Sequence, residues 1–216
     1  MQQFKVDTVV SGALDNNTYI LQNNANNECV LIDPAGSGKE IIGFLKENNL
    51  KVCSILLTHG HYDHIESLNA LKEFSNAPVG ISQADVSLVL NPVRYSKSTK
   101  IDETFAQPEI ILTDGELFKS AGLEIKIIET PGHTRGGMCF VIGNVIFTGD
   151  TLFLNSVGRT DLDGGDKNDL FNSLDKLFNL EGEYTCYPGH GPATSLDHER
   201  DYNFFYKHFK RRSKNN

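Results

Sequence analysis

The 216-residue sequence contains no tryptophan, only two methionines and no long uninterrupted apolar run. Without an apolar run of about 20 residues, a membrane-spanning helix is not expected, and the first ten residues lack the charged start and apolar core of a signal peptide. Basic residues are also in deficit: the net charge of -8 argues against a general nucleic-acid-binding surface. We therefore expect a cytoplasmic protein that has neither a nucleic acid nor a membrane as its partner.

Cysteine is scarce as well, and the four residues form no closely spaced pair. Cys29, Cys53 and Cys139 fall within apolar runs typical of strands, and Cys186 is far from all three. Isolated cysteines in apolar runs are more typical of buried free thiols than of disulfides or thiolate metal ligands. Free thiols fit a reducing compartment such as the cytoplasm.

Strands and helices alternate through the first half of the chain. Strands are predicted at about 4–10, 18–22, 28–33 and 52–57, the last a continuous apolar run typical of a strand buried on both faces. Between the third and fourth strands, Ile41, Ile42 and Leu45 share one face of a predicted helix, and a further helix is expected from Ile65. This half is therefore expected to form a sheet covered by helices.

The second half repeats this alternation. Leu123, Ile125 and Ile127 alternate with charged residues, as in a half-buried strand. A Gly143-Asn144 turn predicts a hairpin, and a helix from Leu170 to Phe178, a strand at 182–187 and a helix from about 196 follow. This alternation of strands and helices, together with an ordinary composition of 39% hydrophobic and 22% charged residues, predicts a single α/β domain spanning 1–216. Two sheets packed face to face with helices outside, a four-layer αββα sandwich, fit this order.

The longest stretch without a periodic pattern is 91–108. A connection of that length often forms a lid or a binding loop.

Residues able to bind a metal gather in loops that directly follow predicted strands. One loop contains THGHYDH, and later loops contain TPGHT, FTGDT and YPGHG. A single histidine in a loop is usually solvated, and an aspartate after glycine is usually a turn residue. Here, however, five of the seven histidines lie in such loops beside two aspartates, at strand ends where a rigid scaffold presents functional groups. The candidate ligands are His59, His61, Asp63, His64, His133, Asp150 and His190.

Seven ligands exceed one tetrahedral zinc site and suit two divalent ions that share a bridging ligand. The expected partition is His59, His61 and His133 for the first ion, Asp63, His64 and His190 for the second, and Asp150 as the bridge. We expect zinc, with iron or manganese as alternatives, because imidazole and carboxylate bind all three. Two such ions about 3.5–4 Å apart would acidify a bridging water and polarise a carbonyl. Asp150, which would bridge the ions, and Asp63, which could orient the nucleophile, are the candidate catalytic residues.

The order HxHxDH, a later His, an Asp in a GD pair and a final His resembles the metallo-β-lactamase superfamily, whose fold is the αββα sandwich. Within it, TPGHTRGGMCF, FTGDTLF and VGRTDLDGGD are similar to the glyoxalase II group, the hydroxyacylglutathione hydrolases, and more closely to its short bacterial-type members. This resemblance implies that a metal-bridging hydroxide hydrolyses S-D-lactoylglutathione or a related hydroxyacyl thioester, so the expected partner is a small-molecule glutathione conjugate. Too few residues follow PGHG for the C-terminal helical domain with which full-length members hold glutathione.

Two departures from that family concern the substrate and the metal-binding loop. In the family, a basic residue nine positions after the bridging aspartate meets the glycyl carboxylate of glutathione, and Arg159 occupies that position. Asp161 stands where full-length members have tyrosine, and a salt bridge to it is the alternative role for Arg159. Glu66 stands where the family usually has glycine, and we interpret it as a first-turn helix acid rather than a residue that supports the ligands.

Other reaction classes stay open. The same motifs also resemble those of persulfide dioxygenases, which share a GRTD stretch and use one iron held by two His and an Asp. The matching residues in this sequence are His59, His133 and Asp150. DLDGGD after that stretch favours the hydrolase. Another metallo-hydrolase of the superfamily is a further alternative, and the complete ligand set argues against a protein that only binds metal. The basic tail KHFKRRSKNN is interpreted as a solvated helix end rather than as a site that recruits anionic substrates.

Overall fold

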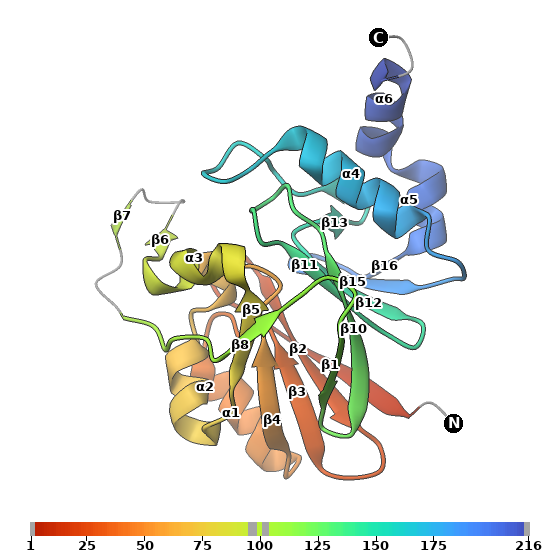
Figure 1. The fold of residues 1–216 in the computed structure, drawn as a ribbon. Coiled ribbons are helices and arrows are strands. Elements are labelled where there is room, and N and C mark those ends of the chain that lie inside the picture. Colours follow the sequence, from red (N-terminus) through yellow and green to blue (C-terminus); the bar gives the residue numbers. More distant parts are fainter. Residues whose placement is uncertain (1–2, 95–98, 101–103, 214–216) are drawn as a thin grey trace.

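The computed structural model describes residues 3–94, 99–100 and 104–213. Two six-stranded sheets pack face to face, with α1 (Gly38–Glu47) and α2 (Leu68–Ser75) beside one and α4 (Lys167–Phe178), α5 (Leu196–Tyr202) and α6 (Phe204–Ser213) beside the other (Figure 1). This arrangement confirms the predicted αββα sandwich. None of the helices in the described part of the chain is long and apolar enough to cross a membrane.

The first sheet has the strand order β1-β2-β3-β4-β5-β8. Its strands are β1 (Phe4–Ser11), β2 (Asn16–Asn23), β3 (Glu28–Ile32), β4 (Lys51–Leu56), β5 (Val79–Ser82) and β8 (Ile110–Leu112). The first three pair antiparallel, and β3, β4, β5 and β8 run parallel to one another. The carboxyl ends of the parallel strands therefore meet at one edge, where loops can bring their side chains together.

The second sheet has the strand order β16-β15-β12-β11-β10-β9. Its strands are β9 (Leu117–Ser120), β10 (Leu123–Glu129), β11 (Met138–Ile142), β12 (Val145–Gly149), β15 (Thr185–Pro188) and β16 (Thr194–Ser195). The predicted hairpin is present as β11 and β12, and β12 pairs in parallel with β15 through the crossover that contains α4. A two-stranded sheet, β13 (Leu152–Phe153) and β14 (Ser156–Val157), follows β12.

Buried side chains form three layers, which explains why the central strands read as apolar runs. Between the sheets, Tyr19 of β2 packs with Phe147 of β12, whose ring centroid is 5.2 Å away. The next residue, Ile20, faces the opposite way and packs under α1. On the outer face of the second sheet, Ile146 belongs to a buried cluster that includes Leu174 of α4. Because side chains alternate along a strand, a central strand such as β12, whose residues are all buried, has an apolar side chain on both faces.

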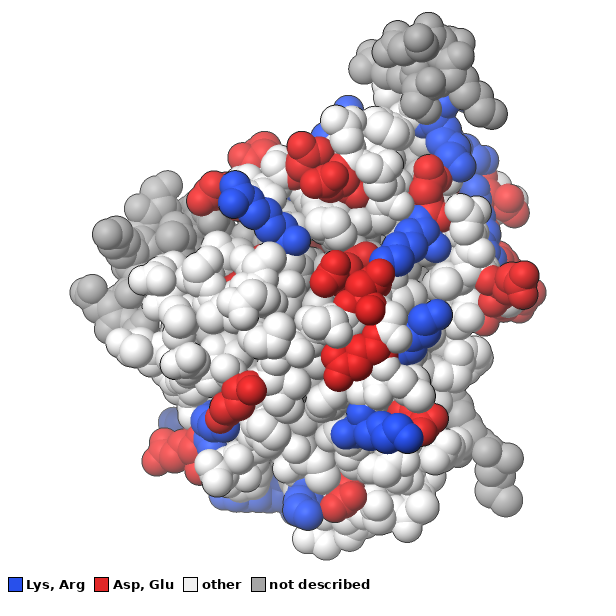
Figure 2. Space-filling view, viewed as in Figure 1, with Lys and Arg blue, Asp and Glu red and all other residues white. Residues whose placement is uncertain are grey.

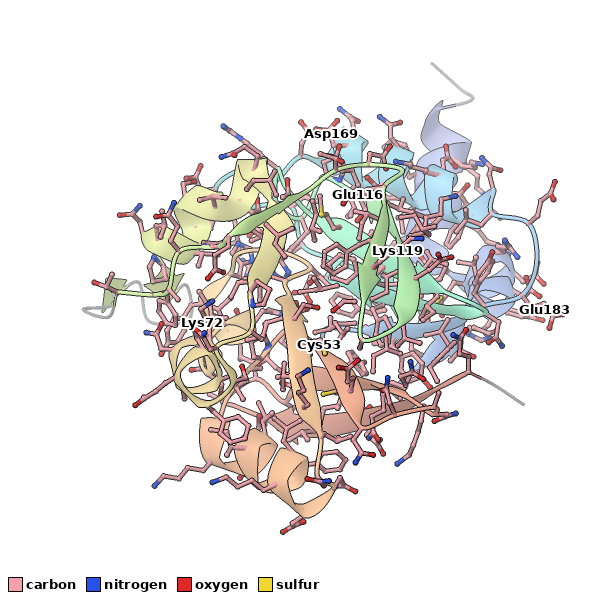
Figure 3. The ribbon with its side chains drawn as sticks, turned by 60° about the horizontal axis from the view of Figure 1, so that its bottom comes forward. Cys53, Lys72, Glu116, Lys119, Asp169 and Glu183 are labelled. Carbon is pink, nitrogen blue, oxygen red and sulfur yellow. The ribbon has the colours of Figure 1, made fainter. Side chains whose placement is uncertain are left out.

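Most charged side chains lie on the outside of these layers, with Asp33, Asp85 and Glu199 among the buried exceptions. Figure 2 shows acidic and basic residues interspersed over one face of the molecule rather than gathered into one basic surface. All four cysteines are free. Cys29 and Cys139 are buried, as expected, and so is Cys186, but Cys53, which lies on β4 (Figure 3), is only half-buried.

Two features of the connections were not predicted. Within 91–108, β6 (Val93–Arg94) pairs with β7 (Thr99–Lys100), while 95–98 and 101–103 lie outside the described residues. The last helix is also broken, because Asn203 is extended at ψ 107°. The side chain of Asn203 replaces the lost helical contacts: its Oδ1 accepts from the Tyr206 amide, and its Nδ2 donates to Glu199 and to the Ser156 carbonyl. Short strands and a polar break carry no periodic apolar pattern, so the sequence did not predict them.

Candidate metal centre

The seven predicted ligands come from four loops that meet at one edge of the sandwich. THGHYDH follows β4 of the first sheet, while the loops with His133, Asp150 and His190 follow β10, β12 and β15 of the second. The structure brings all seven residues together, so the centre spans both sheets.

The five histidines, Asp33 and Asp63 form three overlapping donor groups, of which the third joins Asp33 to His59 and His64 and the first two match the predicted partition. In the first, donor atoms of His59, His61 and His133 lie within 4.8 Å of one another, and all three side chains are buried. In the second, donor atoms of Asp63, His64 and His190 meet the same limit. This is the predicted partition, although the role of these residues as ligands stays a prediction.

Asp150 lies between the two groups. One of its oxygens, Oδ2, is 3.4 Å from His133 Nε2 in the first group and 3.5 Å from His190 Nε2 in the second. The other, Oδ1, is 3.4 Å from His64 Nε2. A carboxylate in this position can be shared by two ions.

The far ring nitrogens fix how two of these imidazoles face the centre. His133 Nδ1 lies 2.8 Å from the carbonyl oxygen of Arg159, and His190 Nδ1 lies 3.0 Å from that of Leu14. Because a carbonyl only accepts hydrogen bonds, Nδ1 carries a proton in both rings, and Nε2 is the nitrogen that faces the centre.

Asp33, which was not among the candidate residues predicted from the sequence, orients two further rings. Its Oδ1 accepts from the Thr58 amide at 2.7 Å, and its Oδ2 accepts from the Thr58 hydroxyl at 2.6 Å and from His64 Nδ1 at 3.1 Å. The Thr58 oxygen is thereby left to accept from His59 Nδ1 at 3.1 Å. With three donors already bound, Asp33 is a positioning residue rather than a ligand. Its place directly after β3, at the same edge as THGHYDH, was the signal that could have revealed it.

A second buried carboxylate, Asp85, ties two ligand loops together. It accepts from the Gly60 amide at 3.1 Å, and from the Thr134 hydroxyl at 2.7 Å and the Gly136 amide at 2.8 Å. Gly60 lies between two candidate ligands and Thr134 follows another, so Asp85 holds the first group in register. Burial raises the pKa of Asp85 despite these donors.

Glycines in the motifs allow the loops to approach closely. A Cβ on Gly189 would lie 2.2 Å from Asp150 Oδ1 and 2.6 Å from His64 Cε1. Gly149, which has a φ of 47°, would place a Cβ 2.4 Å from the Thr58 hydroxyl oxygen. Side chains at these positions would occupy the centre or displace its supports.

The donor set fits divalent metal ions. Burial, together with the neighbouring rings, lowers the pKa of His59 and lowers that of His61 to about 3, so both are neutral. Burial opposes ionisation of His190 too, but hydrogen bonds to Asp150 and Asp63 raise its pKa to about 9. His59 Nε2 is buried with no hydrogen-bond partner among the described residues, as a nitrogen that faces an ion would be.

A pocket of about 690 Å³ opens onto these groups. Arg159 lines it, and its Nε and Nη2 each lie 2.7 Å from an oxygen of Asp161, so the structure has the salt bridge given above as the alternative.

Glu66 is not a first-turn acid, and that interpretation was wrong: α2 begins at Leu68. The chain just before α2 is held by the Ser67 amide, which donates a hydrogen bond to the Pro34 carbonyl oxygen at 3.0 Å.

Sequence comparison agrees with this geometry. The model of the Metallo-beta-lactamase superfamily matches residues 11–190. A probable metallo-hydrolase of Streptococcus pyogenes serotype M6 is 35% identical over 211 residues, covering 94% of this chain and 90% of that protein.

Solved structures with the same fold carry several different names. The B3 metallo-beta-lactamase BLEG-1 gives a TM-score of 0.87 at 30% identity, covering 94% of this chain and 99% of that one. TTHA1623 in a di-iron-bound form gives 0.79 at 32% identity, with coverages of 92% and 99%. ETHE1 from Myxococcus xanthus gives 0.76 at 27% identity, with coverages of 93% and 83%. The match over residues 11–190, with the fold and the His/Asp groups described above, shows that this chain belongs to the metallo-beta-lactamase superfamily.

Proposed function

We propose that this protein is a metal-dependent thioester hydrolase of the glyoxalase II type, acting on S-D-lactoylglutathione or a related hydroxyacyl thioester. The observation that carries the proposal is the position of Asp150 between two three-residue donor groups, at the base of the pocket. Two donor groups that share a carboxylate suit two zinc, iron or manganese ions. Membership in a superfamily of metallo-hydrolases supports an enzyme.

Two ions, when bound, would supply the Lewis acidity that lowers the pKa of water and polarises an acyl carbonyl. Water then adds to the acyl carbon, the C–S bond breaks with its electron pair on sulfur, and a carboxylate, a thiol and a proton result. A thiolate is a stable leaving group, so no strong protein acid is required.

Asp63 is the residue suited to orient the water. Burial opposes its ionisation, but the charge of His64 and hydrogen bonds from His190 and Asn16 keep its pKa low, so it stays a carboxylate. Asn16 Nδ2 donates to Asp63 Oδ2 at 2.9 Å, which fixes the rotation of the side chain. Asp63 also lines the pocket, where it can accept a hydrogen bond from the attacking water.

A persulfide dioxygenase with a single iron is the second candidate. The likeness to the ETHE1 structure is compatible with it, and His59, His133 and Asp150 would hold the iron. Because that reaction uses one iron, the donor group of Asp63, His64 and His190 would bind no second ion, which favours the hydrolase. A β-lactam is a useful control substrate in view of the name of BLEG-1.

The test is steady-state hydrolysis of S-D-lactoylglutathione by protein reconstituted with zinc, iron or manganese, with Asp150→Ala as the control. We expect turnover that the substitution reduces to background. Failure with all three metals would contradict the assignment, and oxygen uptake with glutathione persulfide would then test the dioxygenase.

A further inference from the structure

Beyond the candidate ligands, the wall of the large pocket is mostly apolar. Its apolar lining residues are Leu14, Tyr62, Phe153, Leu154, Leu162 and Pro192. Leu14 and Leu154 have 52% and 39% of their surface exposed, as expected for side chains at a pocket rim. A substrate that passes this rim meets hydrocarbon before it reaches the candidate metal centre.

Among the described residues that line the pocket, Arg159 is the one arginine or lysine. Its guanidinium is engaged in a bidentate pair, since two of its nitrogens each meet a different oxygen of Asp161 at 2.7 Å. This parallel geometry is the strongest that an arginine can form with a carboxylate. Hydrogen bonds from Arg159 lower the pKa of Asp161 to about 2, so the pair persists at neutral pH.

The pair changes what the pocket can recognise. A substrate carboxylate could use Arg159 only by displacing Asp161, which is tethered two residues away and so has a high effective concentration. Glutathione carries two carboxylates and would have to make this exchange. An uncharged thiol portion needs no cation and would instead bury its surface against the apolar wall.

We infer that this pocket selects thioesters whose thiol portion is uncharged and apolar, and that Asp161 is a specificity-determining residue that disfavours anionic thiols by holding Arg159. The inference rests on the proposed function and narrows its substrate class: S-D-lactoylglutathione is expected to be a poorer substrate than a hydroxyacyl thioester of an uncharged thiol. Asp161 does not line the pocket and acts through Arg159, so it is a positioning residue.

Thiol binding to cobalt-substituted protein tests the inference without any turnover. The probes are glutathione and glutathione esterified with ethanol at the glycyl carboxylate, and the signal is the thiolate-to-cobalt absorption band. In the unmodified protein, the ester is expected to bind at least as tightly as glutathione. In Asp161→Asn, glutathione should bind about fivefold more tightly, the size of effect expected when a competing exposed ion pair is removed, while the ester should not change.

Two further variants separate this effect from a general change of charge. Asp163→Asn removes the same charge from the same loop, but Asp163 lines a different, smaller pocket with Arg135. The affinity for glutathione relative to its ester should therefore not change. Adding Arg159→Gln to Asp161→Asn should abolish the gain for glutathione. A loop that had merely been disordered would instead weaken the binding of both probes.

The inference is overturned if unmodified protein binds glutathione about tenfold more tightly than the ester, if Asp161→Asn leaves the ratio unchanged, or if the cobalt protein binds neither thiol. Turnover is scored separately with S-D-lactoylglutathione and with the lactoyl thioester of 1-butanethiol. If neither is hydrolysed while the binding ratio responds to Asp161, the proposed function is wrong and the charge selection stands. If hydrolysis occurs but Asp161→Asn does not change the affinity for glutathione relative to its ester, the function stands and the inference is wrong.

Discussion

At the scale of single residues, the candidate centre depends on acceptors that fix the far nitrogen of four of the five imidazoles, while His61 Nδ1 lies 2.9 Å from His133 Nε2. Arg159 and Leu14 provide backbone carbonyls, whereas Asp33 provides a buried side chain that serves His64 directly and His59 through Thr58. A backbone acceptor cannot be removed by substitution. Asp33 is therefore the position at which the orientation of the rings can be tested.

Asp33→Asn should weaken metal binding about 10-fold to 100-fold, the usual effect of losing a partner that orients a metal-binding histidine. Asparagine tolerates the φ of 50° at this position, so the backbone should not be strained. The amide, however, has only one acceptor atom for three donors. Metal affinity is measured by competition with a chromophoric chelator. Asp114→Asn, at an exposed turn, is the control, and equal affinities in the two variants would refute the role of Asp33.

Metal uptake should also release protons, because the two donor groups differ in protonation. With its pKa raised to about 9, the metal-free His190 holds a proton at neutral pH that an ion must displace. His61, with its pKa lowered to about 3, holds none. His64, in the same group as His190, also holds a proton: burial opposes this, but Asp150 and Asp63 raise its pKa well above the usual range. Affinity for the second ion should therefore rise with pH through about 9, where His190 loses its proton. Calorimetry in buffers of different ionisation enthalpy measures the release, and binding of both ions without proton release would be inconsistent with this account.

At the scale of secondary-structure elements, the centre requires strand ends from both sheets to approach closely. Glycines in the loops after the strands make this possible, because a side chain there would meet Asp150, His64 or Thr58. The packing of the sheets therefore decides whether the donor groups form.

Gly189→Ala should disrupt the second donor group, because the added methyl would overlap Asp150 Oδ1 and the His64 ring. We expect loss of one metal equivalent while the circular dichroism spectrum of the fold is retained. Gly43→Ala in α1 is the matched control: no atom outside the glycine and its immediate surroundings lies within 4 Å of the new Cβ. It should stabilise the helix by about 0.5–1 kcal/mol and leave metal content unchanged. Full metal content in Gly189→Ala would show that the close approach is not required.

The longer elements and the seven candidate ligands were predictable from sequence, because each has a local signal. Apolar periodicity marks strands such as β10 and helices such as α4, and four of the ligands share one short segment. Asp33 and Asp85 were not found, because their partners are up to 51 positions away along the chain. The salt bridge between Arg159 and Asp161 was foreseen only as an alternative, since spacing shows that a pair can form but not which carboxylate the arginine meets.

At the scale of the whole molecule, the two sheets meet at the candidate centre, to which the first contributes the residues after β4 and the second those after β10, β12 and β15. A large core layer, with Phe140 and Phe147 fully buried, sets the distance between the sheets. Because interiors are closely packed, the donor groups are held by the entire sandwich rather than by one loop. Two ions bound there would bridge the sheets.

The central claim is that the seven residues form a two-metal centre, and the most direct test is the metal content of the protein. The protein and its Asp63→Ala variant are reconstituted with zinc, separated from excess metal by gel filtration and analysed by inductively coupled plasma mass spectrometry. We predict two equivalents per chain in the unmodified protein and one in the variant, which retains His59, His61, His133 and Asp150. One equivalent in both would contradict the two-metal account and would match the single-iron alternative.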